Sequence, residues 1–139
     1  MDILNHLGQV NWLAIIVATV GAFLLGGLWY SNKFFGAKWM QEIGLTEEST
    51  DQTHAARTFI TTFVLQFIAA TALAVFLGSD SNWLNGLRSG ALIGLLWIAT
   101  AYGITYLFEQ RTMRLFLINA GFYVVQFAIM GTILGAWHS

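Results

Sequence analysis

The chain contains no cysteine and no proline among its 139 residues, and only 9% of its residues are charged. The absence of cysteine excludes disulfides, thiol redox chemistry and cysteine metal sites. The absence of proline removes the residue that most often kinks a membrane-spanning helix. Because a soluble domain has roughly 25% charged residues, the shortage of charge indicates a membrane protein.

The charges that are present fall outside four long stretches, each long enough to cross a bilayer as a helix: Ile3–Asn32, Thr58–Ser79, Ser89–Phe108 and Leu115–Ser139. A spanning helix needs about 20 mostly apolar residues, and the chain is 57% hydrophobic with a mean hydropathy of +0.66. We therefore predict an all-α membrane protein with four transmembrane helices in one compact bundle. The single domain covers residues 1–139, with spans at about 10–30, 58–78, 85–108 and 115–137. No basic region precedes the first apolar stretch, so we expect a retained helix there, not a signal peptide.

Lysine and arginine are unevenly distributed between the loops. Five of the six lie in the first loop, residues 31–57, or in the third: Lys33, Lys38, Arg57, Arg111 and Arg114. The positive-inside rule then predicts a cell inner-membrane protein with both termini on the periplasmic side. Arg88 is the exception. It would either snorkel outward and pair with Asp80, or line an outward-facing cavity.

The first loop has a helical pattern of its own. Phe35, Trp39 and Ile43 recur at four-residue spacing while Lys38 takes the other side, which predicts a short amphipathic helix at the membrane interface. The bilayer is thus an expected partner. The expected interfacial anchors are aromatic and basic: Trp29, Tyr30, Lys33, Lys38 and Trp39.

Small residues recur every four positions along the spans. These ladders are Ala14, Ala18, Ala22 and Gly26, then Ala70, Ala74 and Gly78, then Gly86, Gly90 and Gly94, with Gly131 and Gly135 in the last span. Such ladders let helix backbones approach closely. They predict tight packing within the chain or a face for self-association, and we expect a homo-oligomer. The two helical hairpins also show similar Gly, Ala and Trp patterns, so a duplicated hairpin is a further hypothesis.

A few neutral polar side chains lie deep in the apolar stretches, and these form the candidate intramembrane site: Gln66, Asn119, Tyr123, Gln126, Thr62 and Thr100. Helical spacing places those of each span on a shared face. Two interpretations remain open. They hydrogen-bond across helices and fix the register, or they line a polar cavity for a neutral or hydrated ligand.

The residues that membrane enzymes and ion-coupled transporters need are missing from the spans. None of the seven acids lies in one, and His6, His54 and His138 lie at ends or in the first loop, which argues against proton coupling, haem ligation and a Ser–His–Asp hydrolase. We expect no enzyme activity and no cofactor. Glu47, Asp51 and His54 are a weak metal candidate, since their spacing places them on one helix face. No basic run indicates nucleic-acid binding.

Three segments resemble the opening of the bacterial membrane-protein family known as domain of unknown function 1761: Val10–Ala14, Gly26–Tyr30 and Phe35–Met40. The resemblance covers the whole chain and implies about this length and four spans, but it implies no reaction, cofactor or substrate. Ser31-Asn32-Lys33 departs from the Gly-Pro expected after the Trp-Tyr pair. The sequence thus favours a non-catalytic binding, scaffold or accessory component of the membrane. The alternative is a facilitative channel or transporter for a small neutral solute.

Overall fold

A computed structural model describes residues 7–44, 52–78 and 81–137, without the side chains of residues 52–54. Within these ranges every regular element is a helix: η1 (Leu7–Gln9), α2 (Trp12–Trp29), α3 (Gly36–Ile43), α4 (Gln52–Leu77), α5 (Trp83–Ile93), η3 (Gly94–Ala99), α6 (Thr100–Glu109) and α7 (Met113–Ala136). Four helical segments are long and apolar enough to cross a membrane: Trp12–Trp29, Ala55–Leu77, Trp83–Glu109 and Met113–Ala136. The predicted all-α class with four membrane helices is confirmed.

Uncharged side chains begin three of these spans. The side chain of Asn11 accepts hydrogen bonds from the backbone N–H groups of Leu13 and Ala14, at 3.1 and 3.2 Å. Asn82 caps α5 in the same way, and Thr112 caps α7. A cap satisfies donors that have no partner inside the helix. Each of these three helix ends therefore gains one or two hydrogen bonds without bringing a charge into the apolar segments.

The amphipathic helix predicted in the first loop is present as α3. It ends at Gly44, whose φ of 78° is the left-handed conformation that glycine adopts without strain. The second span differs from the prediction at its start, because α4 already begins at Gln52. Ala55 and Ala56 are strong helix formers, so the helix begins before the charge-free stretch does.

Helix α7 is the centre of the molecule, since it contacts α2, α3, α4, α5 and α6. Its closest neighbour is α5. A Cβ atom added to Gly86 would overlap the carbonyl oxygen of Gly131, and one added to Gly90 would overlap that of Phe127. A Cβ atom added to Gly94 would likewise lie only 2.7 Å from the Cα atom of Val124. The glycine ladder of the third span therefore packs within the chain, against α7, and is not free to bind a second copy.

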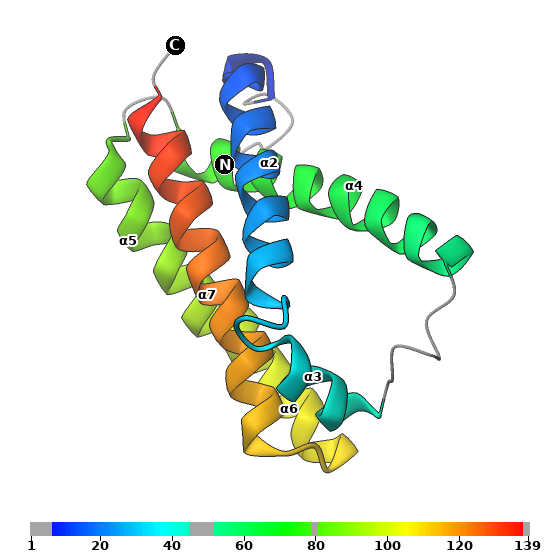
Figure 1. Ribbon diagram of the computed structural model, residues 1–139. Helices are drawn as coiled ribbons and strands as arrows, with labels where there is room; N and C mark the ends of the chain where they lie inside the picture. The colour runs from blue at the N-terminus through cyan, green and yellow to red at the C-terminus, as the bar shows by residue number, and fades with distance from the viewer. Residues whose placement is uncertain (1–6, 45–51, 79–80, 138–139) are drawn as a thin grey trace.

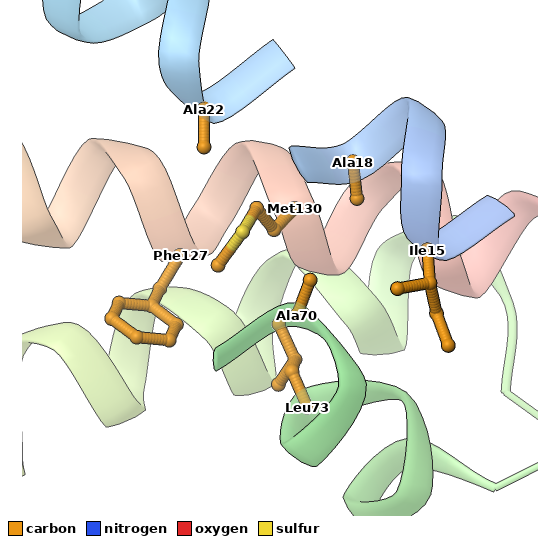
Figure 2. Packing of buried hydrophobic residues seen from close by; sticks show 7 residues of the cluster. All are labelled: Ile15, Ala18, Ala22, Ala70, Leu73, Phe127 and Met130. Carbon is orange, nitrogen blue, oxygen red and sulfur yellow. The ribbon is translucent and has the colours of Figure 1, made fainter. Parts of the chain in front are cut away.

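The hydrophobic core lies where α2, α4 and α7 meet (Figure 2). Its buried residues are Ile15, Ala18, Ala22, Ala70, Leu73, Phe127 and Met130. Ala18 and Ala22 of the α2 ladder and Ala70 of the α4 ladder are among them, so these ladders also serve packing within the chain. Because small side chains leave room for close backbone approach, dispersion contacts hold the three helices together where hydrophobic exclusion by water is absent.

Helix α4 is arranged differently from the other spans. In Figure 1, α2, α7 and the α5–α6 segment lie alongside one another, whereas α4 leaves this group at a steep angle. Its C-terminal half joins the core, but its N-terminal half carries exposed apolar side chains such as Ile60, Val64 and Leu65. Phe23 of α2 keeps contact with this half through the rings of Phe59 and Phe63. The two hairpins thus pack differently, which gives no support to the hypothesis of a duplicated hairpin.

The third span contains an irregularity that the sequence did not predict. Residues Gly94–Ala99 form a π-helical turn between α5 and α6. The hydroxyl of Thr100 donates to the carbonyl oxygens of Leu96 and Trp97, at 2.7 and 3.0 Å. A π turn widens the helix and shifts the register of the residues that follow it. The helix is therefore irregular here without any proline.

Candidate functional site

Asn119 links three helices at the end of the bundle next to α3. The hydroxyl of Tyr30, at the end of α2, donates to Asn119 Oδ1 at 2.7 Å, and Asn119 Nδ2 donates to the hydroxyl of Tyr106 in α6 at 2.6 Å. Asn119 is six residues from the start of α7, which places it about 9 Å along the helix. The Tyr30 hydroxyl thus joins the end of α2 to α7.

Aromatic rings surround this asparagine. Tyr102 stacks on Tyr123 with ring centroids 5.4 Å apart, and Tyr102 also meets Tyr106 edge to face. Phe122 contacts Trp29 and Tyr30. Asn119 and the four tyrosines near it are called the tyrosine–asparagine cluster: Tyr30, Tyr102, Tyr106, Asn119 and Tyr123. Its members are partly buried, so the cluster is neither sealed in the core nor fully open.

Two glutamines meet deeper in the bundle. Gln66 Nε2 of α4 donates to Gln126 Oε1 of α7 at 3.0 Å, and both side chains are buried, with 8% and 2% of their surface exposed. Among the described residues, Gln66 Oε1 is the buried side-chain polar atom that has no hydrogen-bond partner. An unpaired buried oxygen costs about 1–3 kcal/mol. The pair is therefore a link between helices that leaves one acceptor unused.

The polar residues of α7 form one stripe. Asn119, Tyr123 and Gln126 lie on the side of the helix that faces α4, α6 and the end of α2. Beyond Gln126 the same side continues with Met130, which is completely buried within the hydrophobic core (Figure 2). The stripe thus begins near α3 and ends at the hydrophobic core.

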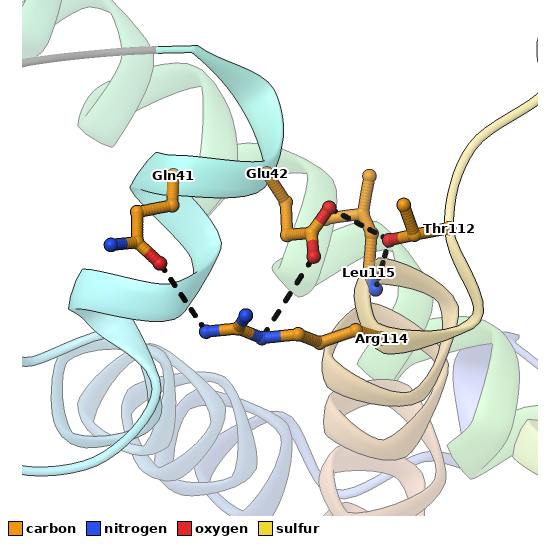
Figure 3. A network of polar contacts seen from close by, with 5 residues as sticks. All are labelled: Gln41, Glu42, Thr112, Arg114 and Leu115. Carbon is orange, nitrogen blue, oxygen red and sulfur yellow. Dashed lines mark hydrogen bonds and ion pairs between the residues drawn. The ribbon is translucent and has the colours of Figure 1, made fainter.

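Helix α3 is fastened across the end of the bundle where the stripe begins (Figure 3). Glu42 lies 3.8 Å from Arg114 Nε and accepts a hydrogen bond from the Thr112 hydroxyl at 2.7 Å. Gln41 Oε1 accepts a longer bond, at 3.4 Å, from Arg114 Nη2. Trp39 meets the ring of Tyr30 edge to face. We call this set of contacts the α3 latch; it places the first and third loops at the same end of the protein.

The opposite side of α7 is apolar. Together with α5 it forms a groove of about 300 Å³, lined by Leu87, Val124, Val125, Ala128, Ile129, Thr132 and Ile133. The hydroxyl of Thr132 donates to the carbonyl oxygen of Ala128 in its own helix. This side therefore offers no free polar group and suits contact with acyl chains.

The predicted site residues divide into two groups. The structure pairs Gln66 with Gln126, and it brings Asn119 and Tyr123 into the tyrosine–asparagine cluster. Thr62 is partly exposed, one turn before Gln66. Thr100 does not belong to the site, because it is exposed and its hydroxyl bonds its own helix.

The predicted interfacial anchors also divide. Lys33 and Lys38 are exposed, as expected. Trp29 and Tyr30 instead hold α2 to α7, since Trp29 Nε1 donates to the Ile118 carbonyl oxygen at 3.0 Å. The amphipathic pattern predicted α3 itself but gave no sign that Trp39 would turn inward onto Tyr30.

Several other positions predicted from the sequence lie outside the described residues. Glu47 and Asp51 of the weak metal candidate lie outside the described residues, as does the side chain of His54. Asp80, the expected partner of Arg88, is also outside them, and Arg88 itself is exposed. In the described part of the chain no group of three His, Asp or Glu side chains is close enough to hold a metal ion.

Comparison with known proteins identifies the chain by family alone. The family model described as "Protein of unknown function (DUF1761)" matches residues 13–135. No curated protein and no solved structure matches the chain. Because the match covers most of the 139 residues, the chain belongs to this family.

Proposed function

We propose that this member of the DUF1761 family is a non-catalytic binding or accessory component of the cell inner membrane, with both termini on the periplasmic side. The observation that carries the proposal is the closed end of the polar stripe. Asn119, Tyr123 and Gln126 continue into Met130, which is buried between α2 and α4. A stripe that ends in the core can hold a ligand but offers no path to the other side, which favours binding over transport.

The hydrogen bonds along the stripe support the same proposal. Gln66 bonds Gln126, and Asn119 bonds two tyrosines. A facilitative path needs polar groups that are free to replace the hydration shell of a passing solute. Here most of these groups are used to join helices, so their main effect is to position α2, α4, α6 and α7.

Solute flux tests the choice between binding and transport. The full chain, reconstituted in liposomes, is exposed to a glycerol or urea gradient, and vesicle swelling is followed by stopped-flow light scattering. We expect the same rate as for protein-free liposomes. Swelling that is several-fold faster, and that is lost in Gln66→Leu, would establish the facilitative alternative and overturn the proposal.

We also propose that the protein self-associates. The glycine ladder of α5 packs against α7, so the candidate surface is the exposed half of α4 with Ile60, Val64, Leu65 and Ile68. Light scattering of the purified protein, corrected for detergent, gives the mass directly. A mass that is a multiple of 15.4 kDa is expected, and a monomer at all concentrations would contradict self-association.

A further inference from the structure

The apolar groove on α7 is flanked by two other helices. At its α5 edge the Cα atom of Ala128 lies 3.2 Å from a Cβ atom added to Gly90. At its α2 edge the Cδ1 atom of Ile133 lies 3.5 Å from a Cβ atom added to Gly21. The groove therefore runs along the surface of α7 between α5 and α2, and Figure 1 shows α7 between these two helices.

The groove is too small for a helix and has the size of a single acyl chain. It extends from Val124 to Ile133, which is about 14 Å along α7, and its volume is about 300 Å³. A helix about 10 Å in diameter would fill roughly 1,000 Å³ over that length. The one hydroxyl in the lining, that of Thr132, already bonds Ala128 of its own helix. An unbranched hydrocarbon chain matches such a space and needs no polar partner.

The groove lies in the leaflet next to three exposed tryptophans. Trp12 begins α2, Trp83 begins α5 and Trp137 follows α7, all at one end of the bundle (Figure 1). Exposed tryptophans are typical of the membrane–water interface. Ile133 is four residues from Trp137, so the groove begins about 6 Å below this interface. Its length of about 14 Å is close to the hydrocarbon depth of one leaflet, about 15 Å.

Arg88 adds a positive charge at the depth of the groove. Gly86 and Gly90 lie against Gly131 and Phe127 of α7, so Arg88 of α5 is level with the middle of the groove. Arg88 is exposed, and within the ranges that the structure describes it forms no ion pair. A cation at this depth is costly unless it reaches the interface or finds a counter-charge.

The direction of α5 lets Arg88 reach the headgroups. Side chains of a helix lean toward its N-terminus, and α5 begins at Trp83, about 7.5 Å before Arg88. An arginine extended this way brings its guanidinium to the interface while its methylenes stay in the hydrocarbon. Leu87, the preceding residue, lines the groove. The charge and the groove thus belong to adjoining parts of α5.

We propose that the groove binds one acyl chain of a phospholipid whose phosphate is held by Arg88. A guanidinium binds phosphate oxygens in a bidentate manner, and a lipid phosphate lies at the headgroup level above the groove. A second copy of the chain matches less well, because the groove does not admit a helix and no acid lies between residues 83 and 108. The site is on the side of α7 opposite the polar stripe, so the inference goes beyond the proposed function.

Paired lipids test the phosphate contact on the full chain in detergent. Dioleoyl phosphatidylglycerol and dioleoylglycerol have the same acyl chains, but only the first has a phosphate. Native mass spectrometry is expected to show several-fold better retention of phosphatidylglycerol. Arg88→Gln should lower that retention about fivefold, and Arg88→Lys, which keeps the charge, should preserve most of it. Equal retention of the two lipids, or full retention in Arg88→Gln, would overturn the inference.

A filled groove tests the acyl-chain contact. Ile129→Trp places a large ring in the lining and should lower the retention of both lipids. Leu117→Trp is the matched control, because Leu117 is an exposed residue of α7 outside the groove. If thermal unfolding shows that Ile129→Trp is destabilised, Thr132→Phe fills the same groove one turn further along. Unchanged retention in a folded filling variant would contradict binding of the chain in the groove.

A soluble phosphate separates the lipid from a free anion. Glycerol 3-phosphate has the phosphate group without acyl chains, so a large excess should not displace phosphatidylglycerol. Displacement would show that Arg88 binds phosphate without help from the groove and would overturn the inference. None of these results depends on solute flux, so the proposed function and this inference fail separately.

Discussion

Gly90 of α5 lies against the backbone of Phe127 in α7 so closely that a single added methyl group would overlap the Phe127 carbonyl oxygen. Backbone contact of this kind depends on glycine at each crossing, and Gly86 and Gly94 continue it one turn away on either side. The α5–α7 pair is consequently the most closely packed part of the protein. Its glycines determine how near the third and fourth spans can approach.

Gly90→Ala should therefore destabilise the protein by about 1–3 kcal/mol, the usual cost of overpacking. Gly27→Ala is the matched control, because Gly27 is also a helical glycine but has no atom within 4 Å of an added Cβ. That variant should be neutral or slightly stabilising. Thermal unfolding in detergent, followed by circular dichroism, compares the two. Equal stability of both variants would contradict the tight α5–α7 contact.

Asn119→Leu should cost more stability than a single lost hydrogen bond. The change leaves the hydroxyls of Tyr30 and Tyr106 without their shared partner. Each unpaired hydroxyl then lowers the free energy of unfolding by about 1–3 kcal/mol. In a double-mutant cycle with Tyr30→Phe, the second substitution should cost less than it does alone. Strictly additive effects on unfolding would show that the Tyr30–Asn119 bond is not made in solution.

Glu42→Ala should release α3 without unfolding the bundle. The side chain of Glu42 is 15% exposed and joins both Arg114 and Thr112, so its removal breaks the charged part of the latch. Arg111→Ala is a suitable control, because Arg111 pairs locally with Glu109, two residues away. Hydrogen exchange of the α3 amides should speed up in Glu42→Ala and stay unchanged in Arg111→Ala. Protected α3 amides in both variants would mean that Trp39 and Tyr30 hold the helix alone.

The orientation predicted from the loop charges is tested by reporters fused after Ser139. Alkaline phosphatase is active only outside the cytoplasm, and green fluorescent protein is fluorescent only inside it. Because five of the six basic residues lie in the first and third loops, we expect an active phosphatase fusion and a dark fluorescent one. The reverse pattern would place the α3 latch on the periplasmic side.

Charge and hydropathy were enough to predict the helices, since a bilayer excludes charge from any segment that crosses it. The amphipathic spacing of Phe35, Trp39 and Ile43 likewise predicted α3, which runs from Gly36 to Ile43. The small-residue ladders indicated close packing but left the partner open. Only the positions of α5 and α7 in space show that Gly90 faces Phe127 of the same chain.

Sequence analysis named the site residues on α7 but missed their partners at the end of α2 and in α6. Helical spacing put Asn119, Tyr123 and Gln126 on one face. In the structure Asn119 bonds Tyr106, Tyr123 stacks on Tyr102 and Gln126 bonds Gln66. Tyr30 and Tyr106 were missed as partners of Asn119, because a tyrosine near a helix end is equally typical of an interfacial anchor. The steep angle of α4 was also beyond sequence analysis, since a helix that is apolar over most of its surface does not specify which of its sides meets a neighbour.

The α3 latch also imposes an order of events on biosynthesis. Glu42 and Thr112 are separated by 70 positions along the chain, and the residues between them include the second and third spans. When α3 leaves the ribosome, its partners on α7 have not yet been made. The helix must therefore wait at the membrane surface on its own amphipathic face until the last hairpin is inserted. Its docking is therefore one of the final steps of assembly, and a truncated or misinserted last hairpin leaves α3 without its partners Thr112 and Arg114.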